Sequence, residues 1–157
     1  MTDPILRGYT IFCDDIRSEV SGKTTFVGTY DGVLFIHGEF PFVLSKFGIA
    51  IRYQEQKGAF TNEEAKLRIF LPGDEANKAS IESLLPMEDA RKSAPPLPLD
   101  DDPSEIKYIA VGANLILSPL VIPKAGTIKV RVQCGEETVK LGSLVVARAG
   151  TEVPRSS

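Results

Sequence analysis

The sequence contains few of the residues from which metal sites and catalytic centres are usually built. Its 157 residues include two cysteines, one histidine and no tryptophan. Two cysteines are too few for a disulfide-stapled scaffold, and the single histidine, His37, excludes any metal site that needs two. No G-x-S-x-G nucleophile elbow accompanies it. We therefore expect no catalytic residue, no cofactor and no enzymatic activity.

Long apolar runs are also missing. No segment approaches the roughly 20 apolar residues that a membrane-spanning helix needs, and the longest candidate, residues 115–122, is interrupted by Pro119. Near the N-terminus, Asp3 and Pro4 stand where a secretory signal would have basic residues and then an apolar run. We expect a cytoplasmic protein without an integral membrane segment, in which Cys13 and Cys134 are buried and reduced.

Charge of one sign does not dominate the chain as a whole. Lysine and arginine number 18 against 21 acidic residues, which gives a net charge of −3. Proteins that bind duplex DNA usually carry a basic excess, so we expect no nucleic-acid partner. The charge is unevenly distributed, because residues 105–157 hold 7 basic and 4 acidic side chains whereas residues 88–104 hold 2 and 5. The final third of the chain is therefore locally basic.

Alternating apolar and polar residues, which are typical of strands with one buried face, recur along the chain. In residues 127–134 the even positions are apolar and the odd positions polar, namely Ile128, Val130, Val132 and Cys134 against Thr127, Lys129, Arg131 and Gln133. A turn signal follows at Gly135, and residues 138–147 return with a change of phase at Gly142. This pattern predicts a β-hairpin whose second strand contains a β-bulge around Gly142 and Ser143.

The same reasoning predicts about seven or eight strands in all. Besides the hairpin and residues 43–53, strands are expected at residues 9–14, 24–37, 65–71 and 106–117, with a break in the second of these at Asp31 and Gly32. Residues 75–85 are the only candidate helix, and an irregular edge segment is the alternative there. The predicted fold is all-β, an antiparallel β-sandwich of the immunoglobulin-like or a similar Greek-key kind.

One domain is expected over residues 1–157, with its core between residues 8 and 147. Residues 86–104 are rich in proline and aspartate, and five of the eleven prolines lie among them. Because proline lacks the N–H that an interior strand donates, we expect a long extended connection there that crosses from one sheet to the other. The tail, residues 149–157, lacks periodicity and is expected to be disordered.

Residues 12–23, together with Gly28 and Tyr30, resemble the opening of a family of small bacterial proteins of unknown function. The shared pattern is F-C-D-D-I-R-x-E-x-x-G-K followed by G-x-Y, and the hairpin near the C-terminus resembles theirs too. The resemblance implies a bacterial source and a sandwich-like domain. It assigns no catalytic residue.

The same segment supplies the candidate binding surface, which comprises Asp14, Asp15, Arg17, Glu19, Gly22, Lys23 and Tyr30. Asp15, Arg17 and Glu19 share one face of an extended chain, and an arginine between two acids can pair with a carboxylate. Gly22 supplies the left-handed conformation that a tight turn needs. Two interpretations are open: a charged hairpin end that only stabilises its own turn, or a surface that contacts a partner.

The leading functional hypothesis is a non-enzymatic bacterial protein-binding or assembly module. Such a module would present the polar segment 14–23, or a sheet edge, to an unidentified protein partner or to a second copy of itself. The alternative is a calcium- or lipid-surface-binding sandwich similar to C2 domains, because Ca²⁺ prefers oxygen ligands such as loop carboxylates. Its candidate ligands are Asp14, Asp15, Asp74 and Asp101.

Overall fold

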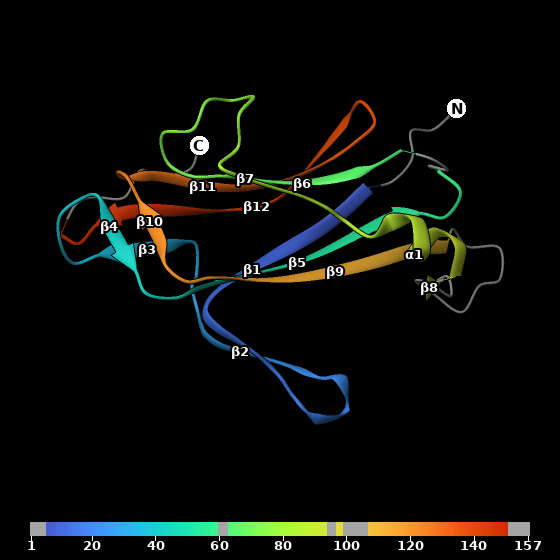
Figure 1. Ribbon diagram of the computed structural model, residues 1–157, viewed down its shortest axis with the longest axis horizontal. Helices are drawn as coiled ribbons and strands as arrows, with labels where there is room; N and C mark the ends of the chain where they lie inside the picture. Colours follow the sequence, from blue (N-terminus) through green and yellow to red (C-terminus); the bar gives the residue numbers. More distant parts are fainter. Residues whose placement is uncertain (1–5, 60–62, 94–96, 99–106, 151–157) are drawn as a thin grey trace.

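Two five-stranded β-sheets face each other in the structure, a computed structural model that describes residues 6–59, 63–93, 97–98 and 107–150. Sheet A, the lower layer in Figure 1, has the strand order β2 (Thr24–Thr29), β1 (Leu6–Ser18), β5 (Phe47–Gln56), β9 (Lys107–Leu117) and β8 (Leu97–Pro98). Sheet B, the upper layer, has the order β3 (Val33–Ile36), β12 (Glu137–Arg148), β11 (Gly126–Cys134), β6 (Ala65–Phe70) and β7 (Ile81–Leu84). A separate two-stranded sheet pairs β10 (Leu120–Ile122) with β4 (Phe42–Leu44).

The apolar faces of the two sheets form the core. Fully buried side chains come from both layers, among them Phe47, Ile49, Ile51 and Tyr53 of β5 and Ile128, Val130 and Val132 of β11. The predicted all-β, sandwich-like fold is confirmed. One pairing departs from the predicted antiparallel order, because β3 runs parallel to β12.

The predicted hairpin is confirmed as β11 and β12. Its register shifts between Val130, which lies opposite Gly142, and Arg131, which lies opposite Lys140, so Leu141 is the extra residue of a β-bulge. Leu141 is buried and points toward sheet A, where a Cβ atom added to Gly8 of β1 would lie 2.7 Å from its Cδ2 atom. The absence of a side chain at residue 8 therefore lets the bulge pack against the opposite sheet.

Other strand predictions agree in place but not always in length. The segment 24–37 is broken at Asp31 and Gly32, as expected, and forms β2 and β3. The segment 43–53 is two strands instead of one, because β4 pairs with β10 and only β5 belongs to sheet A. Strands β7, β8 and β10 lie outside the predicted strands. Cys13 and Cys134 are buried and free, as expected, and burial raises the pKa of each thiol.

Of the two interpretations for residues 75–85, the helix is wrong, and the alternative of an edge segment agrees better with the structure. Residues Ile81–Leu84 form strand β7, which pairs with the outer edge of β6. This pairing satisfies backbone groups of residues 81–84, whereas a helix with a single apolar turn would gain little from packing. The helix α1 (Met87–Ser93) begins directly after Pro86, a position that proline tolerates at the start of a helix.

The proline-rich connection crosses between the sheets, as predicted, because the chain leaves sheet B at β7 and next pairs with sheet A at β8. It includes α1, which was not expected there, and residues 94–96 and 99–106 lie outside the described residues. Most of the predicted disordered tail also lies outside them, but the Ala149 N–H donates to the Ile36 carbonyl. No helix in the described part of the chain is long and apolar enough to cross a membrane.

A buried ion pair joins α1 to the sandwich. Glu55 of β5 is 1% exposed and is the only charged residue among the buried residues described. Arg91 of α1 donates to its carboxylate through Nε at 2.6 Å and through Nη2 at 3.2 Å. Arg91 also donates to Cys134 Sγ of sheet B, and Tyr53 Oη donates to Glu55. The pair therefore connects the helix to both sheets.

Removing the arginine from this pair should destabilise the fold strongly. In the Arg91→Ala variant the Glu55 carboxylate would stay buried without its charged partner, and we expect the free energy of unfolding to fall by about 3–5 kcal/mol. The matched control is Lys92→Ala, because Lys92 pairs with Glu88 on the exposed side of the same helix and should contribute about 0.5 kcal/mol or less. Urea denaturation measures both variants, and equally small losses would contradict the role of the buried pair.

Candidate anion-binding site

The residues of the predicted binding surface lie on a two-stranded arm that extends beyond the sandwich (Figure 1). Residues 6–13 of β1 pair with β5. Cys13 also pairs with β2, as do residues 15–18 farther along the strand. The short 3-10 helix η1 (Val20–Gly22) turns the chain between the two strands of the arm. Gly22 has a φ of +80°, which is the left-handed conformation expected there, and Lys23 is exposed beside it.

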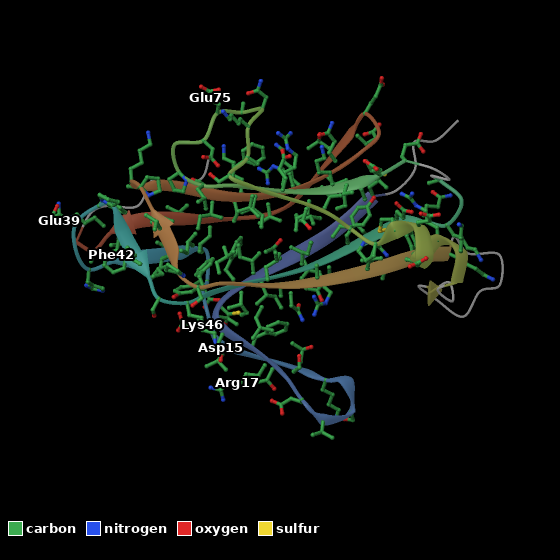
Figure 2. The ribbon with its side chains drawn as sticks, viewed as in Figure 1. Asp15, Arg17, Glu39, Phe42, Lys46 and Glu75 are labelled. Carbon is green, nitrogen blue, oxygen red and sulfur yellow. The ribbon has the colours of Figure 1, made fainter. Side chains whose placement is uncertain are left out.

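Most of the charge near the base of the arm is paired within the protein. Asp15 lies 2.7 Å from Lys46 Nζ and 3.1 Å from Arg17 Nε (Figure 2), and hydrogen bonds from these two cations lower the pKa of its carboxyl. The structure thus brings Asp15 and Arg17 together as the sequence predicts. Glu19 contributes a backbone hydrogen bond to the Lys23 carbonyl instead of an ion pair among the described residues. These contacts favour the interpretation of a charged hairpin end.

Asp14 and Tyr30 meet where the arm joins the sandwich. Tyr30 Oη donates a hydrogen bond to the Asp14 carboxylate, and burial together with this bond raises the pKa of Tyr30. Gly28 makes room for the carboxylate, since its φ is +66° and a Cβ atom there would lie 2.3 Å from Asp14 Oδ2. The motif residues therefore account for the conformation of the arm.

The three predicted calcium ligands that the structure describes are not assembled into one site. Asp14 and Asp15 belong to the arm, Asp74 lies between β6 and β7 of the other sheet, and Asp101 lies outside the described residues. Within residues 6–59, 63–93, 97–98 and 107–150, no three histidine, cysteine, aspartate or glutamate side chains are grouped closely enough to hold a metal ion.

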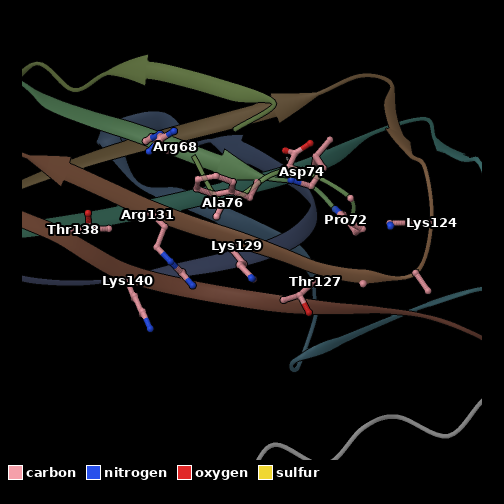
Figure 3. Close-up of a pocket in the computed structure, with 15 residues that line it drawn as sticks. Arg68, Pro72, Asp74, Ala76, Lys124, Thr127, Lys129, Arg131, Thr138 and Lys140 are labelled. Atoms are coloured by element: carbon pink, nitrogen blue, oxygen red, sulfur yellow. Dashed lines mark hydrogen bonds between the residues drawn. The ribbon is translucent and has the colours of Figure 1, made fainter. Parts of the chain in front are cut away.

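A cavity of about 630 Å³ lies on the outer face of sheet B, beside the loop 71–80 (Figure 3). The alternation of β6 and β11 sends their apolar residues into the core and turns the intervening side chains outward. Those outward side chains are largely basic. We call this site the cationic cavity. Its basic lining residues are Arg68 of β6, Lys129 and Arg131 of β11, Lys140 of β12, and Lys124 of the loop between β10 and β11.

Three of these cations stand in one row across the sheet. Arg131 on the middle strand lies directly opposite Arg68 on β6 and Lys140 on β12. Neighbouring strands are about 4.8 Å apart, and like charges directly opposite each other destabilise a sheet. Because a bound anion would offset this repulsion, the row is a candidate anion site.

Arg68, at one end of the row, is partly neutralised by the protein. Its Nε atom donates to Glu82 Oε1 at 3.0 Å, and its guanidinium lies over the Phe70 ring at 5.1 Å from the ring centroid. Its Nη2 atom donates to the Asn77 carbonyl oxygen at 2.6 Å, so the loop 71–80 also holds the guanidinium. The first cation of the row is therefore held in place by a side chain on either side.

Arg131, the middle cation of the row, has no carboxylate partner among the described residues. Arg131 donates through Nη1 to the carbonyl oxygens of Val130 at 2.9 Å and Gly142 at 3.2 Å, and burial lowers its pKa. Lys129 and Lys140 are exposed and form no ion pair within the described residues. The cationic cavity thus carries positive charge that the described protein leaves uncompensated.

The loop that bounds the cavity is organised by Asp74. Its carboxylate accepts hydrogen bonds from the N–H groups of Leu71 and Ser80 and from Ser80 Oγ, each at 2.8 Å. Burial opposes the ionisation of Asp74, but these hydrogen bonds outweigh it and lower the pKa of the carboxyl. Asp74 is therefore a structural anion that shapes one wall of the cavity.

The sequence analysis did not predict the cationic cavity. Its visible signals are the outward alternation of Thr127, Lys129 and Arg131 and the basic excess of residues 105–157. Arg68 comes from a strand much earlier in the chain, and only the pairing of β6 with β11 places it beside Arg131. That pairing leaves no pattern in the sequence.

Fold and site together define an all-β, sandwich-like protein with a cationic cavity on one of its sheets. The family described as "Family of unknown function (DUF6941)" matches residues 8–147, and the chain belongs to this family. No curated protein and no solved structure matches the chain. Membership of a family of unknown function is thereby confirmed, while the shared opening motif and the bacterial source stay predictions.

Replacing Asp74 should loosen the loop 71–80 without unfolding the sandwich. The Asp74→Ala variant loses the acceptor of three hydrogen bonds, and we expect the free energy of unfolding to fall by about 1–2 kcal/mol. Because the folded-state pKa of Asp74 lies below its unfolded value, this contribution is complete above the unfolded pKa and is lost as pH falls through the folded-state pKa. Urea denaturation at several pH values measures the effect.

The matched control for this variant is Glu75→Ala, which removes the neighbouring, exposed carboxylate. Hydrogen exchange at the amides of Leu71 and Ser80 should become faster in Asp74→Ala and stay unchanged in the control. Equal exchange rates in the two variants would show that Asp74 does not organise the loop.

Proposed function

We propose that this protein is a non-enzymatic binding module that recognises an acidic segment of a partner protein in the cationic cavity. The observation that carries the proposal is the row of Arg68, Arg131 and Lys140, three positive side chains directly opposite one another in the sheet. Carboxylates brought into this row would offset the repulsion among the cations. Binding would therefore relieve an unfavourable interaction that the free protein contains.

The lining of the cavity favours an extended protein segment as the ligand. One wall is partly apolar, with Phe70, Leu71 and Pro72, and the floor is a strand surface that presents cations and threonine hydroxyls. In an extended peptide, side chains on the same side recur about every 6–7 Å. Two carboxylates on one side of the peptide can therefore contact different cations of the row, while a hydrophobic neighbour packs on the apolar wall.

The chemistry of the lining residues supports binding over catalysis. The lining residues that the structure describes include no histidine and no cysteine, and their one carboxylate, Asp74, is engaged in the loop. Acid–base or nucleophilic catalysis needs a group free to exchange a proton or attack a substrate, whereas cations and hydroxyls suffice to hold carboxylates. We extend the proposal to a bacterial cytoplasmic setting. The resemblance in residues 12–30 supports the bacterial source, and the two free, buried cysteines favour a reducing compartment.

Reversing two exposed charges in the cavity should abolish most of the binding. A fluorescein-labelled peptide rich in aspartate and glutamate is expected to bind the wild-type chain, with an affinity that falls as salt is added. The K129E/K140E variant should bind at least about tenfold more weakly, because each substitution replaces attraction by repulsion at short range. Fluorescence anisotropy titration measures the dissociation constants, and circular dichroism verifies that the variant is folded.

The matched control is K57E/K107E, which reverses two exposed lysines outside the cavity and changes the net charge equally. An equal loss of affinity in this control would mean that net charge alone attracts the peptide, against the proposal. Inorganic phosphate that binds at the cavity while the peptide does not would assign a small-anion site in place of a protein-binding one.

A further inference from the structure

Arg131, in the middle of the row of cations, has two donor atoms that the described residues leave unused. Its Nη1 atom donates to the carbonyl oxygens of Val130 at 2.9 Å and Gly142 at 3.2 Å. No hydrogen bond or ion pair within the described part of the chain uses its Nε or Nη2 atom. In Arg91, the same two atoms hold the two carboxylate oxygens of Glu55. Arg131 therefore offers a fork of donors that suits two oxygens of one anionic group.

Two lysines lie beside this fork. Lys129 is two positions before Arg131 on β11, so both side chains leave the same face of the sheet at a spacing of about 7 Å. Lys140 lies directly opposite Arg131 on β12, at a spacing of about 5 Å. Figure 3 shows the three side chains pointing the same way from their two strands. The fork and two ammonium groups thus serve one part of the cationic cavity.

These donors exceed what a single carboxylate can accept. The two oxygens of a carboxylate fill the fork of Arg131, and its single negative charge leaves the lysines uncompensated. A phosphate monoester carries a charge of about −1.5 to −2 near pH 7 and has three acceptor oxygens. Two of these oxygens can accept from the fork while the third accepts from a lysine. The group of cations therefore matches a phosphate ester better than a carboxylate.

The size and lining of the cavity indicate that the ligand contains more than a free phosphate ion. A volume of about 630 Å³ is within the range of sites that hold much larger ligands. The wall formed by Phe70, Leu71 and Pro72 is partly apolar, and a phosphate ion has no apolar surface to bury against it. A phosphorylated side chain within a protein segment supplies both the anionic group and the apolar neighbours.

We propose that the cationic cavity recognises a phosphorylated serine or threonine within the acidic segment of the partner protein, so that phosphorylation of the partner strengthens binding. This inference rests on the function proposed above and adds the residue that the centre of the site selects. Arg68 and Lys124 lie on different sides of this centre (Figure 3). Carboxylates that flank the phosphorylated residue can therefore contact cations that the phosphate does not use.

Fluorescence anisotropy with three labelled peptides tests the proposal. The first is an acidic peptide with one central serine, and the second carries phosphoserine at that position. In the third, the serine and one neutral neighbour are replaced by aspartate, which matches the charge of the second. The phosphopeptide should bind at least about tenfold more tightly than the serine peptide and more tightly than the charge-matched peptide. Equal affinity of the phosphopeptide and the charge-matched peptide would overturn the proposal.

The Arg131→Lys variant tests the fork itself. It keeps the positive charge and removes the paired donors, so the affinity for the phosphopeptide should fall about tenfold while the charge-matched peptide binds nearly as before. The matched control is Arg68→Lys, because Arg68 is already engaged by Glu82 and Asn77, and the preference for the phosphopeptide should persist there. Circular dichroism verifies that both variants are folded. A preference that persists in Arg131→Lys would overturn the proposal.

If Arg131→Lys does not fold, NMR of the wild-type chain decides. The Nε–H signal of Arg131 should shift further with the phosphopeptide than with the charge-matched peptide at saturation, and equal shifts would overturn the proposal. Inorganic phosphate that displaces the phosphopeptide at equal concentration would assign the centre to a free anion, also against it. Equal binding of all three peptides would overturn the phosphate preference alone, whereas the failure of all three to bind would overturn the proposed function too.

Discussion

The single extra residue in β12 determines how the core and the cationic cavity fit together. Side chains in a regular strand alternate between its two faces, so a regular strand that buried Leu141 could not also bury Leu144. The bulge lets Leu141 and Leu144 both enter the core while Lys140 stays opposite Arg131. The carbonyl oxygen of Gly142 then accepts a hydrogen bond from Arg131 Nη1. One local irregularity thus packs the core, aligns the row of cations and holds its middle member.

The arm and the cationic cavity differ in how their charges are compensated. On the arm, Asp15 faces both Lys46 and Arg17, so the cations there already have a carboxylate partner. In the row, Glu82 contacts Arg68 at one end, while Lys140 at the other end has no ion pair among the described residues. A chain with a net charge of −3 therefore creates a local positive field on one face, and a local field is what attracts an acidic segment.

Sequence periodicity predicts features that depend on one strand at a time. The alternation in residues 127–134 identified the core face of β11 correctly, because the pleat alone decides which side each residue faces. The pair of Asp15 and Arg17 was predictable for the same reason. The row across sheet B was not, since Arg68 becomes a neighbour of Arg131 only through strand pairing. At residues 75–85 the local spacing favoured a helix, and the open edge of β6 decided for a strand.

The open strand surface of sheet B determines what kind of ligand the cationic cavity can hold. Exposed lysines contribute little individually to affinity, because water and salt screen their charge. Arg131 is different, since its guanidinium is already fixed by the carbonyl oxygens of Val130 and Gly142 and has less freedom to lose when a ligand binds. A ligand therefore gains most when several of its carboxylates contact the row at once, and an extended acidic segment meets that condition where a single small anion does not.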